Sequence, residues 1–251
     1  LSGGRTRVFL KIQDGCNSFC SFCVIPFARG RSRSVPVSAL VEQVKSLHAQ
    51  GIQEVVLTGI HIGDYADGDR DLGALVHALL KRTAMPRLRL TSIEPPELTP
   101  ALLDAFSSSR LCAHVHLSAQ YLQTDVLRGM RRSYTGDAAE AALWKLHGLI
   151  PNVFIGMDLI VGFPGETAAH FDETVERLQR SPWTRLHVFP YSERDGTKAV
   201  ALPGAVPVGE RNGRARVLRS LSLDRHIAQA AAQVGTTKSV HLKPTLVKIS
   251  A

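Results

Sequence analysis

The sequence predicts an α/β fold in which short parallel strands alternate with helices. Six β-branched runs are each followed by a stretch of helical period, with turn residues between them. The 251 residues are 44% hydrophobic, enough for one sizeable core. Six such units suit either a partial TIM-type (β/α)6 barrel or an open doubly wound sheet, and handedness rules do not separate the two.

The first three units occupy the first 107 residues. The strand patterns are at 8–12, 54–57 and 87–92, and the helical patterns are at 36–50, 72–82 and 99–107. Gly51 closes the first helix, and Thr99 before Pro100 caps the third, since proline is favoured at the first helical position. Long loops follow the first two strands, at 13–34 and 58–71.

The last three units extend to residue 189. Their strands are expected at 113–117, 153–161 and 186–189, and the fourth strand is followed by a long loop at 118–135. Helices are expected at 137–149 and 167–180, and an arginine-rich helix at 208–233 follows a linker. In either architecture the loops after the strands share one face, so chemistry is expected there.

Three of the four cysteines lie in eight residues of the first of these loops. Cys16, Cys20 and Cys23 have the spacing C-x3-C-x2-C, which suits thiolates converging on one iron-sulfur cube with one iron left open. A disulfide framework is disfavoured because the cluster holds an odd number of cysteines. Structural zinc or inert buried thiols remain as alternatives, although no second ligand pair lies nearby. Cys112 is expected to be a small core residue.

Charge and hydropathy limit the class of protein. The formal net charge of +8 suggests a polyanionic partner, or simply a basic surface. We find no apolar run long enough to span a membrane and no signal peptide at the start, so we expect a cytoplasmic protein that needs no membrane. The chain begins without methionine, and we expect it to be a fragment of a longer protein.

The segment 11–30 resembles the radical S-adenosylmethionine (SAM) enzymes, and within them the methylthiotransferases. It reads KIQDGCNSFCSFCVIPFARG, and further matching motifs recur in order along the chain: LTGIHIG at 57–63, SIEP at 92–95, RRSYT at 131–135, DLIVGFPGET at 158–167 and HVFPYS at 187–192. The resemblance implies the partial TIM-type barrel, for which we expect residues 1–206. A basic C-terminal helix at 207–234 and the start of a truncated RNA-binding β domain at 235–251 are expected to follow.

Three subgroups share this scaffold. They act on isopentenyl-type adenosine in tRNA, on threonylcarbamoyladenosine in tRNA, or on a ribosomal protein. The motif at 58–63, with 93–95 and 187–192, is most similar to the enzymes for threonylcarbamoyladenosine next to the anticodon. The other two substrates stay open as alternatives, as do a catalytically inactive RNA-binding fragment and a zinc-stabilised binding module.

The resemblance also implies the cofactors. A 4Fe-4S cluster on three cysteines binds SAM at its open iron and, with an electron from a donor, cleaves it reductively to a deoxyadenosyl radical. Family members carry a second 4Fe-4S cluster, which supplies or carries sulfur, on an N-terminal domain that this chain lacks. We therefore expect this chain alone to cleave SAM without completing sulfur insertion.

Residue by residue, the resemblance assigns Cys16, Cys20 and Cys23 to the cluster, with Phe22 packed beside it or simply in the core. No catalytic residue is assigned. The expected cofactor contacts, each of which could instead be a turn, a solvated loop residue or an internal partner, are Thr58, Gly59, Glu94, Gln120, Asp158 and Gly162.

Basic residues form three sets that could contact a tRNA anticodon stem-loop. Two lie on loops of the active face, at Arg29, Arg31 and Arg33 and at Arg128, Arg131 and Arg132. The third follows the C-terminal helix at Arg211, Arg214, Arg216, Arg219 and Arg225, where a solvated helix face is an equal explanation. We expect the protein to be monomeric.

One departure from the family pattern follows Gln120. Family members usually have a small turn with serine and glycine there, whereas this chain has Tyr-Leu-Gln-Thr-Asp at 121–125. These bulky residues predict either crowding of the SAM site with reduced activity, or a loop that follows another path.

Overall fold

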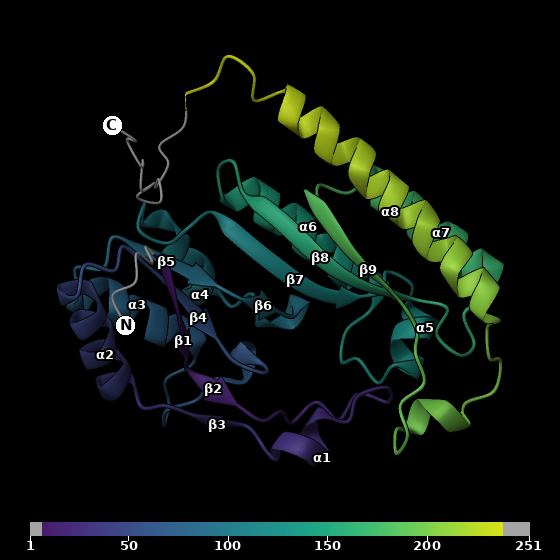
Figure 1. The fold of residues 1–251 in the computed structure, drawn as a ribbon, viewed down its shortest axis with the longest axis horizontal. Coiled ribbons are helices and arrows are strands. Elements are labelled where there is room, and N and C mark those ends of the chain that lie inside the picture. The colour runs from purple at the N-terminus through teal and green to yellow at the C-terminus, as the bar shows by residue number, and fades with distance from the viewer. Residues whose placement is uncertain (1–6, 238–251) are drawn as a thin grey trace, which may run out of the picture.

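The computed structural model describes residues 7–237, and an arc of parallel strands lies at its centre (Figure 1). Seven strands fill six positions of this arc, because two short strands share one position. The strands are β1 (Arg7–Lys11), β4 (Glu54–Thr58), β5 (Arg87–Leu90), β6 (Ser92–Ile93), β7 (His114–Gln120), β8 (Phe154–Val161) and β9 (Arg185–Pro190). They pair in the orders β1-β4-β5 and β6-β7-β8-β9. Neighbours in the sheet are therefore neighbours along the chain, without the reversal of a doubly wound sheet. This order confirms the partial (β/α)6 barrel.

The third strand position is broken in two, and this break joins the halves of the barrel. β5 pairs with β4, and after Thr91 the chain continues as β6, which pairs with β7. The Thr91 amide still donates to Leu57 of β4, and Leu88 of β5 bridges to Leu111 ahead of β7. The arc is thus continuous across the break.

Helices cover the outside of the arc (Figure 1). They are α2 (Val37–Ala49), α3 (Leu72–Arg82), α4 (Pro100–Asp104), α6 (Gly136–Leu149), α7 (Ala168–Arg180) and α8 (Val208–Ala231). Side-chain oxygens cap α3, α4, α6 and α7 at Asp71, Thr99, Thr135 and Thr167. The helices expected from periodicity are therefore present, with ends that differ by a few residues.

Several short elements were not expected from the sequence. Two are helices in the long loops, α1 (Ile25–Arg29) and α5 (Thr124–Gly129), and two form the antiparallel pair β2 (Gln13–Asp14) and β3 (Arg33–Ser34). Three are 3₁₀ turns: Ile62–Asp64, Pro95–Glu97 and Lys198–Ala201; a fourth 3₁₀ turn, Ala105–Ser107, forms the end of the helix expected at 99–107. Elements of two to six residues carry too little periodicity to be recognised without their tertiary contacts.

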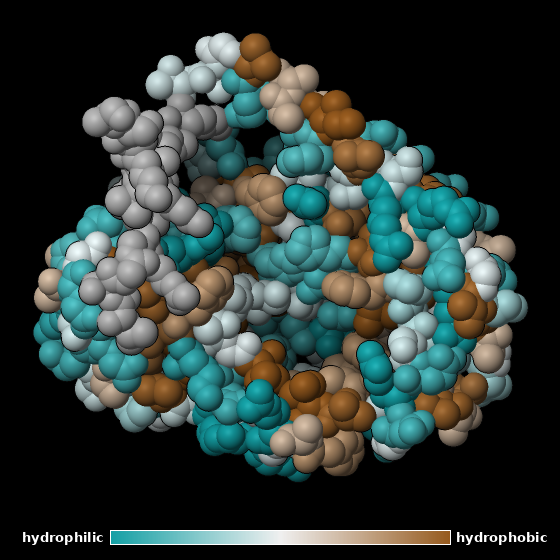
Figure 2. All heavy atoms as spheres, in the orientation of Figure 1, coloured by the Kyte–Doolittle hydropathy of each residue, from teal (hydrophilic) through white to brown (hydrophobic). Residues whose placement is uncertain are grey.

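The inner face of the barrel is a polar hollow, visible as a hydrophilic depression in Figure 2. In β7 and β9 buried residues alternate with more exposed ones, because successive side chains of a strand point to opposite faces. The residues on the more exposed face of these two strands include His114, His116, Ser118, Arg185 and His187. The apolar core accordingly lies between the strands and the helices.

Helix α8 is attached to the barrel through buried arginines. Arg211 and Arg214 are 5% and 7% exposed, and Arg214 pairs with the buried carboxylate of Glu166 at 2.7 Å. Further along, the Arg225 guanidinium lies 3.8 Å from the centre of the Trp183 ring. These arginines hold the helix in place and are not free for RNA, which corrects the interpretation of the third basic set for these positions.

Two further sequence predictions concern the C-terminal segment and the membrane. The expected β segment near the C-terminus falls mostly at 238–251, outside the described residues. Within residues 7–237, no helix is long and apolar enough to cross a membrane. The cytoplasmic location stays a prediction.

We predict that Leu143→Ala lowers the free energy of unfolding by about 2–5 kcal/mol, because it opens a cavity in the core. Leu143 of α6 is 0% exposed. Leu149→Ala is the matched control on the same helix, since Leu149 is 58% exposed, and it should change stability by no more than about 0.5 kcal/mol. Urea unfolding followed by circular dichroism measures both, and equal effects would contradict the assigned packing of α6.

Candidate active site

The cysteine loop is anchored to the barrel by the buried side chain of Gln13. Its amide nitrogen donates to the Gly15 carbonyl at 2.7 Å and to the Ser32 hydroxyl at 2.8 Å. Its carbonyl oxygen accepts from the His61 backbone amide at 2.9 Å. Both ends of the loop and the exit of β4 are thereby joined to one side chain.

Gly15 makes the sharp turn into the cysteines. Its φ is +76°, and a Cβ there would lie 2.1 Å from the Arg31 carbonyl oxygen. Both the left-handed backbone and the close approach require glycine.

The three cysteines line one cleft at the carboxyl ends of the strands. The lining comes from the cysteine loop and from the exits of β4, β6 and β7, and it consists of Cys16, Ser18, Cys20, Phe22, Cys23, Ile25, Ile60, His61, Ser92, Glu94, Ser118, Gln120 and Arg132. The thiols are free and partly exposed, whereas Cys112 is buried elsewhere, as expected. Three accessible thiols from one loop, with apolar walls and polar groups opposite, fit an iron-sulfur cluster with an adjoining polar cofactor.

Phe22, assigned beside the cysteines, both lines this cleft and packs inward. Its ring meets that of Phe163 edge to face, with centroids 6.4 Å apart. The two roles considered for it from the sequence are therefore compatible.

His61 is the central polar group on one side of the cleft. Its Nδ1 lies 3.5 Å from the Cys16 sulfur and 3.2 Å from the Ser18 hydroxyl, while its Nε2 contacts Glu97. Burial opposes the charge on the imidazole, but hydrogen bonds with Asp64, Cys16 and Glu97 outweigh it and raise the pKa of His61 to about 12. The ring is thus held as an imidazolium beside the first thiol.

The Cys16 thiol responds to this neighbour. Burial alone would raise its pKa, but hydrogen bonds from His61 and Ser18 outweigh burial and lower the pKa below its usual value. The thiolate, which is the form that binds metal, is therefore favoured at this position.

Gly63 leaves the space that Glu97 needs to reach His61. A Cβ on Gly63 would lie 1.8 Å from the Glu97 carboxylate, so any side chain would displace it. The same carboxylate accepts from the Glu94 backbone amide at 2.7 Å, which closes the 3₁₀ turn after β6. The position of Glu97 therefore requires a glycine at position 63 of the preceding exit loop.

Arg132 occupies the opposite side of the cleft. It donates to the Cys20 sulfur at 3.0 Å and pairs with Glu94 at 2.5 Å, and its side chain is only 4% exposed. Burial raises the pKa of Cys20, although Arg132 works against the increase. This arginine therefore belongs to the site. The sequence grouped it with basic residues expected to contact RNA phosphate, and its burial corrects that expectation.

Gln120 enters the cleft through a strained backbone. Its φ is +60°, and the pairing of β7 with β8 shifts register just before it. Bulges beside active sites commonly redirect a side chain in this way.

The bulky segment after Gln120 does not crowd the cleft. Tyr121 is 0% exposed, belongs to the hydrophobic core and is not among the cleft residues. Its hydroxyl is buried as well, without a hydrogen-bond partner among the described residues. The loop therefore runs away from the cleft, as in the second alternative from the sequence, and does not crowd it.

Thr58 and Gly59 do not line this cleft. A Cβ on Gly59 would lie 2.7 Å from the Gln13 carbonyl oxygen. The glycine therefore permits close approach of two backbones of the protein at this point.

Asp158 and Gly162 also lie outside the cleft and have other partners. Asp158 pairs with His116 at 2.9 Å in the hollow. Gly162, with φ +75°, makes room for the Arg211 side chain, because a Cβ there would lie 2.2 Å from its Cγ. Of the six expected cofactor contacts, the structure brings Glu94 and Gln120 to the cysteines.

His61 and Arg132 had no assigned role in this cleft from the sequence. Both lie inside motifs that the sequence identified, at 57–63 and 131–135. His61 follows β4 and Arg132 lies in the long loop after β7, and the loops after parallel barrel strands meet on one face. A polar side chain within a motif in such a loop is therefore the sequence signal that could have placed both residues in the site.

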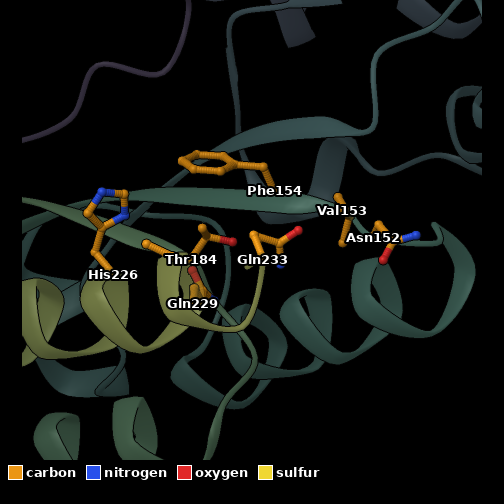
Figure 3. A pocket seen from close by; sticks show the side chains of 8 residues that line it. Asn152, Val153, Phe154, Thr184, His226, Gln229 and Gln233 are labelled. Carbon is orange, nitrogen blue, oxygen red and sulfur yellow. The ribbon is translucent and has the colours of Figure 1, made fainter. Parts of the chain in front are cut away.

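A second cavity of about 350 Å³ lies at the other end of the barrel (Figure 3). His226 and Gln229 of α8 and Gln233 just after it face the cavity, opposite Phe154 at the start of β8 and Thr184 just before β9. The cavity lies where the strands begin and is therefore on the far side of the barrel from the cysteine cleft. Active sites of parallel barrels lie at the carboxyl ends of the strands, so we do not assign this cavity to the active site.

Comparison with known proteins identifies the relatives of this chain. The Radical SAM superfamily matches residues 10–178. The threonylcarbamoyladenosine tRNA methylthiotransferase MtaB of Treponema pallidum is 40% identical over 210 residues, covering 82% of this chain and 44% of that protein. The tRNA-2-methylthio-N(6)-dimethylallyladenosine synthase of Syntrophus aciditrophicus is 34% identical over 241 residues, covering 94% and 52%.

The fold has solved counterparts as well. Coproporphyrinogen III oxidase (HemN) from Escherichia coli, a radical SAM enzyme, superposes with a TM-score of 0.58 at 16% identity, covering 92% of this chain and 54% of that one. The chain spans about half the length of the curated relatives it matches.

We predict that Glu97→Gln lowers the pKa of His61 from about 12 toward its usual value of 6.5. The substitution removes a negative charge that favours the protonated ring, so the proton is lost at lower pH. NMR titration of the histidine ring nitrogens in the metal-free protein measures the change. Glu42→Gln, which alters an exposed pair with Lys45, is the control and should leave His61 unchanged. An unaltered His61 titration in Glu97→Gln would refute the contact.

Proposed function

Since the chain belongs to the radical SAM superfamily of enzymes, we propose that it is the radical-generating core of a tRNA methylthiotransferase. The observation that carries the proposal is the single cleft in which Cys16, Cys20 and Cys23 meet the charged pair of Glu94 and Arg132. The similarity to two kinds of tRNA methylthiotransferase supports the reaction class.

Cys16, Cys20 and Cys23 would hold a 4Fe-4S cluster through three thiolates. When bound, the cluster supplies the electron for reductive cleavage of SAM, the donor of that electron being another protein or reductant. The protein's part is to hold the thiols, to exclude water with Phe22, Ile25 and Ile60, and to orient the cofactor.

Glu94 and Arg132 are suited to the amino acid end of SAM, which carries an ammonium and a carboxylate. Glu94 can accept from the ammonium, and Arg132 can donate to the carboxylate in a forked arrangement. Gln120, turned into the cleft by its strained backbone, offers an amide for the ribose or the substrate base. Thr58, Gly59, Asp158 and Gly162 stay predictions as cofactor contacts.

We assign the substrate as N6-threonylcarbamoyladenosine next to the anticodon. The support is the motif at 57–63, whose His61 and Gly63 act together with Glu97, and the 40% identity to an enzyme named for that nucleoside. The relative named for dimethylallyladenosine, at 34% identity, keeps that nucleoside as the second candidate.

Sulfur insertion would require more than this chain. The curated relatives are about twice as long, and we infer that a second 4Fe-4S cluster for sulfur lies in the part of such a protein that this chain does not cover. The chain alone would then cleave SAM but leave RNA without a methylthio group.

We predict that anaerobic reconstitution with iron and sulfide gives a brown protein, and that dithionite and SAM then yield deoxyadenosine. Cys20→Ala should abolish both, because two thiolates remain, while Cys112→Ala should retain both, since Cys112 is buried away from the cleft. Absorbance and chromatography measure the two outcomes, and mass spectrometry should find no methylthio nucleoside in added RNA. Zinc uptake without iron, or a cluster without deoxyadenosine, would exclude the proposed activity.

We predict that the exposed arginines of the cysteine loop bind the anticodon stem-loop. Arg29 and Arg31 are exposed beside α1, and reversing both charges should weaken binding of a stem-loop RNA about tenfold or more and reduce its dependence on salt. Arg82→Glu/Arg216→Glu makes the same charge change on exposed positions of α3 and α8 and should have a smaller effect. Equal losses in both double variants, measured by fluorescence anisotropy, would indicate general attraction to a basic protein.

A further inference from the structure

Three side chains of the ligand type preferred by transition metals converge in the hollow of the barrel. His116 Nε2 lies 2.9 Å from Asp158 Oδ1, and His187 Nδ1 lies 3.5 Å from the same oxygen. The two imidazole rings are 4.9 Å apart at their centres. One ligand atom from each residue lies within 4.8 Å of the other two.

The strand pairing places these groups together. They come from β7, β8 and β9, and Asp158 is directly opposite His187 in the pairing of β8 with β9. His116 is opposite Gly156, where a Cβ would lie 2.9 Å from the His116 Nδ1. Only the absence of a side chain at Gly156 leaves the His116 ring in this position.

The cluster is separate from the cysteine cleft, since none of its three residues lines that cleft. It is also accessible, because the side chains of Asp158 and His187 are 22% and 50% exposed toward the hollow. A purely structural ion pair would need one histidine; here two histidines converge on one carboxylate oxygen.

We propose that His116, Asp158 and His187 bind a divalent transition metal ion of the Zn²⁺ or Fe²⁺ class. Two imidazoles and one carboxylate form a ligand set typical of such ions, with the remaining positions open. The open positions face the hollow, where water or an oxygen or nitrogen donor of an entering ligand can complete the coordination. This site goes beyond the proposed radical chemistry and does not depend on it.

The test uses the full chain with Cys16, Cys20 and Cys23 all replaced by alanine, so that the thiols cannot bind the added ion. Titration with Co²⁺ should give visible absorption that saturates at one equivalent, and Zn²⁺ should displace it, as followed by calorimetry. Asp158→Asn, which keeps the size of the side chain, and His116→Ala should each weaken Zn²⁺ binding about tenfold or more.

Two controls distinguish this site from other histidines. His77→Ala alters an exposed histidine 3.6 Å from Asp104 and should leave Zn²⁺ binding unchanged. His61→Ala disrupts the competing group of His61, Glu94 and Glu97 and should also leave binding unchanged.

The proposal is overturned if no saturable binding occurs, or if His61→Ala abolishes binding while Asp158→Asn retains it. Thermal unfolding by circular dichroism verifies that each variant is folded, and the same titration on cluster-loaded protein provides a second measurement with the cysteines intact. Failure of the unaltered chain to assemble a 4Fe-4S cluster would disprove the proposed function without affecting the Co²⁺ and Zn²⁺ titrations of the variant that lacks Cys16, Cys20 and Cys23.

Discussion

The buried amide of Gln13 is the interaction on which the cysteine cleft depends. It is 1% exposed, and it joins the start of the cysteine loop, the end of that loop at Ser32 and the backbone of His61. The Gly15 carbonyl and the His61 amide have no other hydrogen-bond partner among the described residues, so a shorter or apolar side chain at position 13 would leave both polar groups unsatisfied. The geometry between the thiols and the His61 ring is therefore set by one side chain that touches neither.

The acidic side chains in and beside the cleft are paired with cations. Glu94 pairs with Arg132, and His61 pairs with Asp64 and Glu97, so the buried acids have cationic partners. A zwitterionic ligand would exchange one of these pairings for another, which costs less than burying a new unpaired charge. The same arrangement places a cation beside Cys16 and another beside Cys20, where thiolates need compensation.

The sequence was sufficient for the six strand-helix units and for the cysteine loop, because period and spacing are local properties. It was insufficient wherever a residue's role depends on a contact with residues distant in the sequence. Gly59 and Gly162 looked like cofactor turns, yet their missing side chains admit Gln13 and Arg211, which lie 46 and 49 positions away. Tyr121 looked like an obstruction but turns into the core, directly after the register shift near the end of β7 and the positive φ of Gln120. His61, Arg132 and the cluster around Asp158 depend on which strands are neighbours, and no local pattern contains that information.

The pairing of Glu166 with Arg214 has a consequence for where the folding unit ends. The linker composition predicts a division near residue 206, but the Glu166 carboxylate on one side of it pairs with Arg214 on the other and also accepts from the Gly162 and Phe163 amides. A chain cut at the linker would retain a buried carboxylate stripped of its cation, a loss that typically costs about 3–5 kcal/mol. The Glu166–Arg214 pair therefore joins the last helix to the barrel across the linker, while the division near residue 206 stays a prediction.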